Sequence, residues 1–207
     1  MGKDSEAWEK DYSQRGALWS GSVWHLPPLP PGSRVLELGC GNGKSLAGMG
    51  SRSWEVTAID FSSSAVRMCR QVFPDVNNGT LCVADARHLP LRPGLFDGVI
   101  ANHVLSHMHS RDRSHAALEA VRMLKTGGTL SFSAFSDEDF RSRKGVVVEP
   151  GTTENAGGIC THFFTEEEVL SLFGMMTLQS VTTRRWSLRV RGEKFPRAEI
   201  QAIFLSP

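Results

Sequence analysis

The fold of this chain is decided by one stretch, Val35-Leu36-Glu37-Leu38-Gly39-Cys40-Gly41-Asn42-Gly43-Lys44-Ser45. Its apolar start predicts a β-strand, its alternating glycines predict a tight turn, and the residues after Gly43 predict a helix. Glycine has no Cβ, so the backbone of such a turn can approach a ligand closely. The stretch therefore predicts a strand–turn–helix unit that binds a nucleotide-like ligand.

Two common nucleotide-binding motifs do not fit this spacing. The segment Gly43-Lys44-Ser45 resembles the end of a P-loop, but the first glycine of that motif would have to stand at Leu38. The dinucleotide motif GxGxxG would require its third glycine at Lys44. The observed spacing is GxGxG, which excludes a P-loop nucleotidase and does not match the standard dinucleotide fingerprint.

Short apolar runs alternate with amphipathic segments from Arg34 onward, a pattern typical of βαβ units around a mostly parallel sheet. The predicted helices are Lys44–Met49, Ser62–Phe73, Arg111–Leu124 and one that begins after Thr165. The predicted strands are Arg34–Leu38, Glu55–Asp60, Thr80–Val83, Asp97–Ala101 and Thr129–Phe135, followed by an antiparallel pair, Thr177–Trp186 and Glu199–Leu205. Together these elements predict an α/β fold.

The composition fits a single globular domain over residues 1–207. Hydrophobic residues make up 40% of the chain, near the globular average, and no apolar run is long enough for a membrane span. The 23 basic and 22 acidic residues give a net charge of +1, which argues against a nucleic-acid partner. The four cysteines are scattered without metal-ligand spacing, which predicts reduced thiols, a cytoplasmic location and no metal site.

Five segments, taken in order, resemble the motifs of class I S-adenosylmethionine-dependent methyltransferases. They are the glycine loop Glu37–Gly43, the strand end Ile59–Ser62, the turn Ala84–Pro90, the strand Phe96–Ile100 and the turn Leu124–Leu130, in which Thr126 replaces the family's usual proline. The resemblance implies a Rossmann-like, seven-stranded, mostly parallel sheet with helices on both faces and an antiparallel last strand. It also implies S-adenosylmethionine as the cofactor and S-adenosylhomocysteine as the product.

Two further segments are similar to a branch of this family that methylates small molecules and includes the tellurite-resistance type. They are His162–Glu168 and an opening that holds Trp8 and Tyr12. The implied function is methyl transfer to a small-molecule acceptor by in-line displacement. A protein or RNA methyltransferase and a non-catalytic cofactor-binding protein are the alternatives.

The resemblance and the chemistry of the segments imply a set of cofactor-binding residues. A carboxylate at Asp60 can accept both hydrogens of a ribose diol, although an aspartate there could also cap a helix. Asp85 is expected to accept from the adenine amino group, the alternative being a turn aspartate before Arg87. The full set is Tyr12, Trp19, Glu37, Gly39, Cys40, Gly41, Gly43, Asp60, Phe61, Asp85, Ala86 and Asn102.

The catalytic candidates are two histidines. The carboxyl ends of the strands face the ligand crevice in this fold, so His103, which follows the fourth predicted strand, should line that crevice. A neutral imidazole there could take a proton from a hydroxyl or amine acceptor, whereas a soft anionic acceptor would need no base. His103 is the first candidate for this base, and His162 is the second.

Two segments are expected to close over the crevice. Residues 1–31 form an amino-terminal lid and a proline-rich linker, in which Tyr12 and Trp19 would either cap the methionine end of the cofactor or only pack. Residues 136–163 lack strand and helix periodicity and contain several glycines, so they predict a long active-site loop. Both segments are predicted to become ordered when ligand binds.

Overall fold

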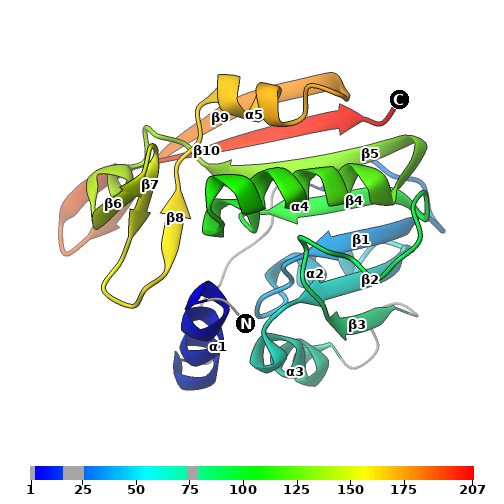
Figure 1. The fold of residues 1–207 in the computed structure, drawn as a ribbon, viewed down its shortest axis with the longest axis horizontal. Coiled ribbons are helices and arrows are strands. Elements are labelled where there is room, and N and C mark those ends of the chain that lie inside the picture. Colours follow the sequence, from blue (N-terminus) through cyan, green and yellow to red (C-terminus); the bar gives the residue numbers. More distant parts are fainter. Residues whose placement is uncertain (1–2, 16–25, 74–78) are drawn as a thin grey trace.

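The structure is a computed structural model that describes residues 3–15, 26–73 and 79–207. A seven-stranded sheet in the order β3-β2-β1-β4-β5-β10-β9 forms its centre (Figure 1). Strands β1 to β5 pair in parallel, and β10 pairs antiparallel with both β5 and β9, which confirms the predicted sheet. The strands are β1 (Arg34–Leu38), β2 (Glu55–Asp60), β3 (Thr80–Val83), β4 (Phe96–Asn102), β5 (Leu124–Phe135), β9 (Thr177–Val190) and β10 (Glu193–Leu205).

The strand order creates a crevice at the carboxyl ends of β1 and β4. From β1 the sheet grows in one direction through β2 and β3, and it then resumes on the other side of β1 with β4 and β5. The connections that leave β1 and β4 therefore diverge, which is the arrangement that leaves room for a ligand in open α/β sheets. The glycine loop follows β1 and His103 follows β4, so both lie at this switch point.

Helices cover both faces of the sheet, because side chains along a strand alternate between the faces. Leu36 and Leu38 of β1 join the core under α4 and α5, whereas Val35 joins the core under α2 and α3. Helix α1 packs beside α3 at the edge of the crevice (Figure 1). The helices are α1 (Lys3–Arg15), α2 (Lys44–Met49), α3 (Ser63–Val72), α4 (Ser110–Met123) and α5 (Glu166–Leu172), with short 3-10 turns η1 (Leu105–His107) and η2 (Phe140–Arg143).

The local sequence explains where two of these helices begin. At the start of α3, Ser62 Oγ accepts the N–H of Ala65 at 3.1 Å. At the start of α5, Thr165 Oγ1 accepts the N–H of Glu168 at 3.1 Å, and the Glu168 carboxylate accepts the N–H of Thr165 at 2.9 Å. This reciprocal capping box fixes the predicted start of α5. Among the described residues, no helix is both long and apolar enough to span a bilayer.

The expectation of a long structureless loop over residues 136–163 is wrong. This segment holds η2 and a three-stranded antiparallel sheet of β6 (Val146–Glu149), β7 (Thr152–Glu154) and β8 (Cys160–His162). Strands of three or four residues are too short to show an alternating pattern in the sequence. The connecting turns use Gly151 and Gly158 at φ 69° and 77°. The segment is thus a small second sheet, shown at the left of Figure 1.

Several strand boundaries also differ from the prediction. Strand β5 begins at Leu124 instead of Thr129, because the backbone bulges where its register with β4 shifts between Phe96 and Gly98. The hairpin of β9 and β10 runs past the predicted ends to a turn at Arg191-Gly192. The extension of β10 carries Arg197 to the crevice.

Candidate active site

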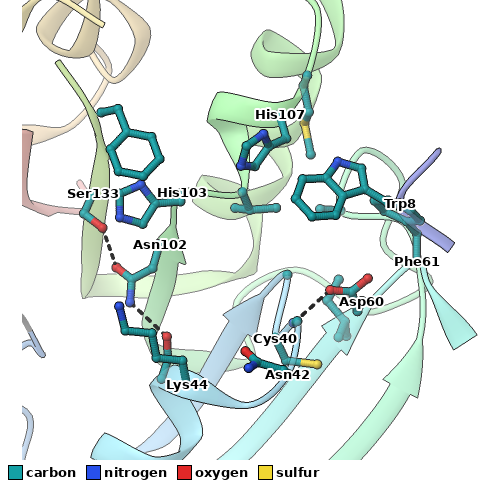
Figure 2. A pocket seen from close by; sticks show the side chains of 18 of the residues that line it. Trp8, Cys40, Asn42, Lys44, Asp60, Phe61, Asn102, His103, His107 and Ser133 are labelled. Carbon is teal, nitrogen blue, oxygen red and sulfur yellow. Dashed lines mark hydrogen bonds between the residues drawn. The ribbon is translucent and has the colours of Figure 1, made fainter. Parts of the chain in front are cut away.

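A cavity of about 370 Å³ lies at the carboxyl ends of the parallel strands. Figure 2 shows Asp60 and Phe61 on one side of it and Asn102, His103 and Ser133 on the other. These two sides are called the Asp60 end and the His103 end below. The Asp60 end also includes Trp8, Tyr12, Gly41, Asp85, Ala86 and Arg87, and the His103 end also includes Lys44, Phe135, Trp186, Arg197, Glu199 and Gln201.

The glycine loop forms the floor of the cavity in a backbone conformation that side chains disfavour. Gly39 and Gly41 have φ 70° and 52°. A Cβ on Gly39 would lie 2.7 Å from a methyl carbon of Val104, and one on Gly41 would lie 2.7 Å from Tyr12 Oη. Gly39, Cys40 and Gly41 line the cavity. Gly43 does not line it: a Cβ at this position would meet the Phe73 ring at 2.6 Å, so Gly43 serves packing against the end of α3.

Asp60 ties this loop to the end of β2. Its Oδ2 accepts the N–H of Gly41 and its Oδ1 accepts the N–H of Ser62, each at 2.9 Å. The residue that caps α3 with its side chain is Ser62 and not Asp60. An ionised carboxylate has about four acceptor sites, so Asp60 retains capacity toward the cavity that it lines. Burial raises the pKa of Asp60 to about 6, even though its two backbone hydrogen bonds lower it.

Cofactor affinity should therefore depend on pH through Asp60. The ribose contact requires the ionised carboxylate, and a pKa of about 6 means that protonation competes below that pH. We expect the affinity for S-adenosylhomocysteine to be constant above about pH 7 and to fall roughly tenfold per pH unit well below pH 6. Calorimetric titrations from pH 5 to 8 measure this, with Asp60→Asn as the control whose affinity should stay flat. A parent profile as flat as that of the control would contradict the assignment.

Glu37 lies beneath the loop and outside the cavity lining. It is only 1% exposed, and burial raises its pKa to about 8, while a hydrogen bond from Ser45 lowers it and the charge of Asp60 raises it. Its Oε2 has no hydrogen-bond partner among the described residues. Glu37 is held by the hydrogen bond from the Ser45 side chain. Glu37 supports the loop from below.

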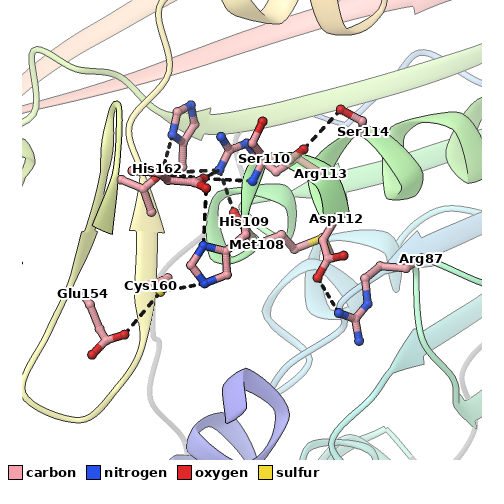
Figure 3. Close-up of polar contacts among 12 residues, drawn as sticks. Arg87, Met108, His109, Ser110, Asp112, Arg113, Ser114, Glu154, Cys160 and His162 are labelled. Carbon is pink, nitrogen blue, oxygen red and sulfur yellow. Dashed lines mark hydrogen bonds and ion pairs between the residues drawn. The ribbon is translucent and has the colours of Figure 1, made fainter. Parts of the chain in front are cut away.

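The adenine-site candidates Asp85 and Ala86 line the cavity, but Asp85 is already engaged. Arg87 Nε donates to Asp85 Oδ1 at 2.9 Å, and Arg87 Nη2 donates to Asp85 Oδ2 at 2.7 Å. Arg87 Nη1 also reaches Asp112 Oδ2 at 2.6 Å, as Figure 3 shows. Burial alone would raise the pKa of Asp85, but these contacts with Arg87 outweigh it and lower that pKa. The sequence reasoning anticipated the turn beside Arg87 and missed Asp112.

Helix α1 roofs the Asp60 end with two aromatic side chains. Trp8 and Tyr12 stack with ring centroids 5.6 Å apart, and each is 8% exposed. Glu9 anchors the helix to the start of α3, accepting from Ser62 Oγ and Ser64 Oγ at 2.6 Å each. Tyr12 thus lies against the glycine loop, close to Gly41. The other aromatic candidate, Trp19, lies outside the described residues.

The His103 end is a polar cluster built from three neighbouring strands. Asn102 Nδ2 donates to Ser45 Oγ at 3.2 Å, and Ser133 Oγ donates to Asn102 Oδ1 at 3.0 Å. His103 Nε2 lies 3.0 Å from Glu199 Oε2 of β10, and its ring stacks on Phe135 with centroids 4.1 Å apart. The sequence reasoning missed Glu199. The alternation of Arg197, Glu199 and Gln201 along one strand face is the signal that could have found it.

The structure does not place His162 at the cavity. This side chain is 2% exposed, and its Nδ1 hydrogen-bonds with Thr152 Oγ1 at 2.8 Å, while Nε2 lies 3.6 Å from Glu168 Oε2. Burial lowers its pKa to about 4, with the nearby charge of Arg113 acting in the same direction. His162 therefore joins the small sheet to α5, and its proposed role as a base is corrected to a structural one. Figure 3 shows it within this polar network.

Other polar side chains near α4 also serve packing. Arg113 Nη1 donates to the backbone oxygen of Met108 at 2.7 Å and to Glu149 Oε1 at 2.9 Å, which joins α4 to β6. His107 lines the cavity, and its Nδ1 hydrogen-bonds with the backbone oxygen of Cys160 at 2.8 Å. Within residues 3–15, 26–73 and 79–207, no group of three or more His, Cys, Asp or Glu side chains is arranged to hold a metal ion.

Comparison with known proteins shows similarity to methyltransferases. Residues 36–132 match the family model described as a methyltransferase domain. A malonyl-[acyl-carrier protein] O-methyltransferase of Geobacter sulfurreducens is 31% identical over 153 residues, which cover 72% of this chain and 57% of that protein. A tRNA (carboxymethyluridine(34)-5-O)-methyltransferase of Arabidopsis thaliana is 34% identical over 127 residues, which cover 61% of this chain and 30% of that protein. The chain thus spans 57% and 30% of the length of these two relatives.

Solved structures show the same fold. A protein of Methanosarcina mazei, described as a SAM-dependent methyltransferase, aligns with a TM-score of 0.68 at 24% identity, covering 87% of this chain and 98% of the other. TehB from Haemophilus influenzae aligns with a TM-score of 0.65 at 13% identity, and the alignment covers 85% of this chain and 58% of TehB. Fold, cavity and family match together define a methyltransferase domain. Residues 36–132 thus belong to the methyltransferase-domain family, and the fold is that of a SAM-dependent methyltransferase.

Proposed function

We propose that this chain transfers the methyl group of S-adenosylmethionine to a small-molecule acceptor by in-line displacement. The observation that carries the proposal is the single cavity that joins Asp60 and the glycine loop to the polar cluster around His103. The cofactor would occupy the Asp60 end, and the acceptor would enter at the His103 end. The two reactants would then meet inside one cavity.

The residues of the Asp60 end fit the cofactor. Asp60 presents a buried carboxylate with spare acceptor capacity to the ribose, and the glycines leave room for close approach. Phe61, Asp85 and Ala86 line the part of the cavity that would take the adenine. The sulfonium of the cofactor supplies a methyl group that is already activated, so the chain's own residues mainly bind, orient and exclude water.

The aromatic side chains that border the cavity support a small acceptor. Trp8 and Tyr12 cover the Asp60 end, and Phe135 and Trp186 border the His103 end. The near-neutral net charge of +1 also favours a small molecule over a nucleic acid. The relative from Arabidopsis thaliana makes tRNA the alternative acceptor. No disulfide joins the four cysteines, all of which lie within the described residues, and this supports a reducing, cytoplasmic setting.

The experiment that tests this proposal offers both acceptor classes to the same preparation. The purified chain and S-adenosylmethionine are incubated with a metabolite panel or with total tRNA, and S-adenosylhomocysteine release and product mass are measured. We expect methylation of a panel compound and none of tRNA. Methylation confined to tRNA would overturn the small-molecule proposal. Cofactor binding without transfer to any acceptor would instead favour a non-catalytic binding protein.

A further inference from the structure

The face of β10 that lines the cavity determines which acceptor fits. Side chains two residues apart on a strand share a face, and Arg197, Glu199 and Gln201 all line the His103 end. Trp186 stands opposite Arg197 in the register of β9, and the guanidinium of Arg197 lies 5.3 Å from its ring centre. Phe135 adds a second aromatic ring. This end therefore combines the Glu199 carboxylate and the Lys44 and Arg197 cations with two aromatic rings.

Neither ring nitrogen of His103 is free to take a proton from the cavity. Nε2 lies 3.0 Å from Glu199 Oε2, and an ionised carboxylate can only accept, so Nε2 must carry the hydrogen. Nδ1 is buried and has no hydrogen-bond partner among the described residues. The ring stacks on Phe135 at 4.1 Å with an interplanar angle of 29°. The imidazole thus acts as a donor to Glu199.

The backbone of His103 is held in a strained conformation that produces this contact. Its φ is 58°, a left-handed value that is strained for a residue other than glycine. The N–H of His103 donates to the backbone oxygen of Ser133 at 2.8 Å, which fixes the residue at the end of β4. Strain at a residue whose side chain serves a neighbouring carboxylate indicates a positioning role.

Glu199 keeps acceptor capacity toward the cavity. Its Oε2 accepts from His103, and its Oε1 accepts from Gln201 Nε2 at 2.7 Å, so about two of four acceptor sites remain. Its side chain is 17% exposed. Burial alone would raise the pKa of Glu199, but the hydrogen bonds from His103 and Gln201 and the charge of Lys44 hold it below its usual range. The group is therefore an ionised carboxylate at neutral pH.

We propose that Glu199 contacts the acceptor and takes its proton, that His103 positions Glu199, and that the acceptor is a hydroxyl or amine compound with an aromatic or apolar body. The ionised Glu199 carboxylate accepts a hydrogen bond from O–H or N–H, which a thiolate, a carboxylate or another oxyanion cannot donate. Phe135 and Trp186 fit the apolar body. This inference rests on the proposed function and names its acceptor class.

The atoms and electrons of the proposed methyl transfer balance with these groups. The lone pair of the acceptor oxygen or nitrogen forms the new bond to the methyl carbon. The electron pair of the broken carbon–sulfur bond stays on the sulfur, which becomes a neutral thioether. The acceptor proton passes to a carboxylate oxygen of Glu199 and then to solvent. Each turnover therefore returns Glu199 to its ionised form.

The test separates the roles of the two residues by substitutions of matched shape. Glu199→Gln keeps the size but removes the charge, and His103→Gln keeps a donor near the position of Nε2 but cannot act as a base. We expect Glu199→Gln to lower kcat at least 100-fold, His103→Gln to lower it less than tenfold, and His103→Ala to lower it more than His103→Gln. Glu193→Gln, at the exposed start of the same strand, is the control and should match the parent.

All variants are first titrated with S-adenosylhomocysteine, whose affinity should change less than twofold, and then assayed on a panel that offers each carbon skeleton as hydroxyl, amine, thiol and carboxylate. If the parent does not bind S-adenosylhomocysteine, the proposed function itself is refuted. If the parent binds cofactor, the inference is overturned by any of three results. These are full activity of Glu199→Gln, equal losses in both His103 variants, or a panel in which no hydroxyl or amine is methylated.

Discussion

Replacement of Asp60 by alanine is expected to weaken S-adenosylhomocysteine binding by about 1.5 to 3 kcal/mol, or roughly 10- to 150-fold. The substitution removes the acceptor expected for the ribose hydroxyls. It also removes the hydrogen bonds that hold the N–H groups of Gly41 and Ser62 at 2.9 Å, so the loop loses its link to β2. Calorimetry of the parent and the variant at pH 7.5 measures the difference.

Asp97→Ala is a matched control for this experiment. Asp97 also accepts a backbone N–H, that of Arg34 at 2.8 Å, and it pairs with Lys125 at 2.6 Å, but it lies outside the cavity lining. Its loss should lower stability slightly and leave cofactor affinity unchanged. An Asp60→Ala variant that stays folded and binds as tightly as the Asp97→Ala control would show that Asp60 is not the ribose ligand.

Replacement of Phe132 by alanine is expected to destabilise the whole domain by about 3 to 5 kcal/mol. Phe132 is fully buried in β5, and its ring meets Phe164 and Phe173 edge-on with centroids 5.5 and 5.3 Å apart. These contacts join the central sheet to the end of the small sheet and to α5. The variant would therefore leave a cavity where three parts of the fold meet. Urea unfolding followed by circular dichroism measures the change.

Phe195→Ala provides the comparison for Phe132→Ala. Phe195 is only half-buried near the tip of the β9–β10 hairpin, where its ring lies 5.0 Å from that of Phe140. Its replacement should cost about 1 kcal/mol, because little apolar surface is lost from the interior. Equal losses of stability in the two variants would mean that Phe132 does not anchor the small sheet and α5 to the central sheet.

The sequence was sufficient to predict the central sheet because its signals are local. The apolar run before Gly39, the glycine spacing and the acid at the end of β2 all lie within short segments whose order defines the fold. The small sheet gave no such signal. Its strands are so short that turn glycines dominate the pattern, and the segment was therefore expected to be a loop.

The candidate site likewise contains residues that the local sequence predicts and residues that it does not. Asp60 and Asp85 were predictable because Asp60 is the last residue of β2 and Asp85 comes two residues after β3, and both line the cavity. Glu199 was not predictable, since it is 96 residues from His103 in the sequence. The two residues meet only because β10 pairs with β5. His162 shows the converse error: it belongs to a recognisable segment, but the small sheet buries it against Thr152. Contacts between distant strands depend on topology that no short motif encodes.

The central claim is that the cavity at the switch point between β1 and β4 binds S-adenosylmethionine. Isothermal titration of the purified chain with S-adenosylmethionine and with S-adenosylhomocysteine tests it most directly. The account predicts one site with micromolar affinity, on the order of −8 kcal/mol, for both ligands. The absence of both binding heat and a thermal shift with either ligand, from a preparation shown to be folded, would contradict it.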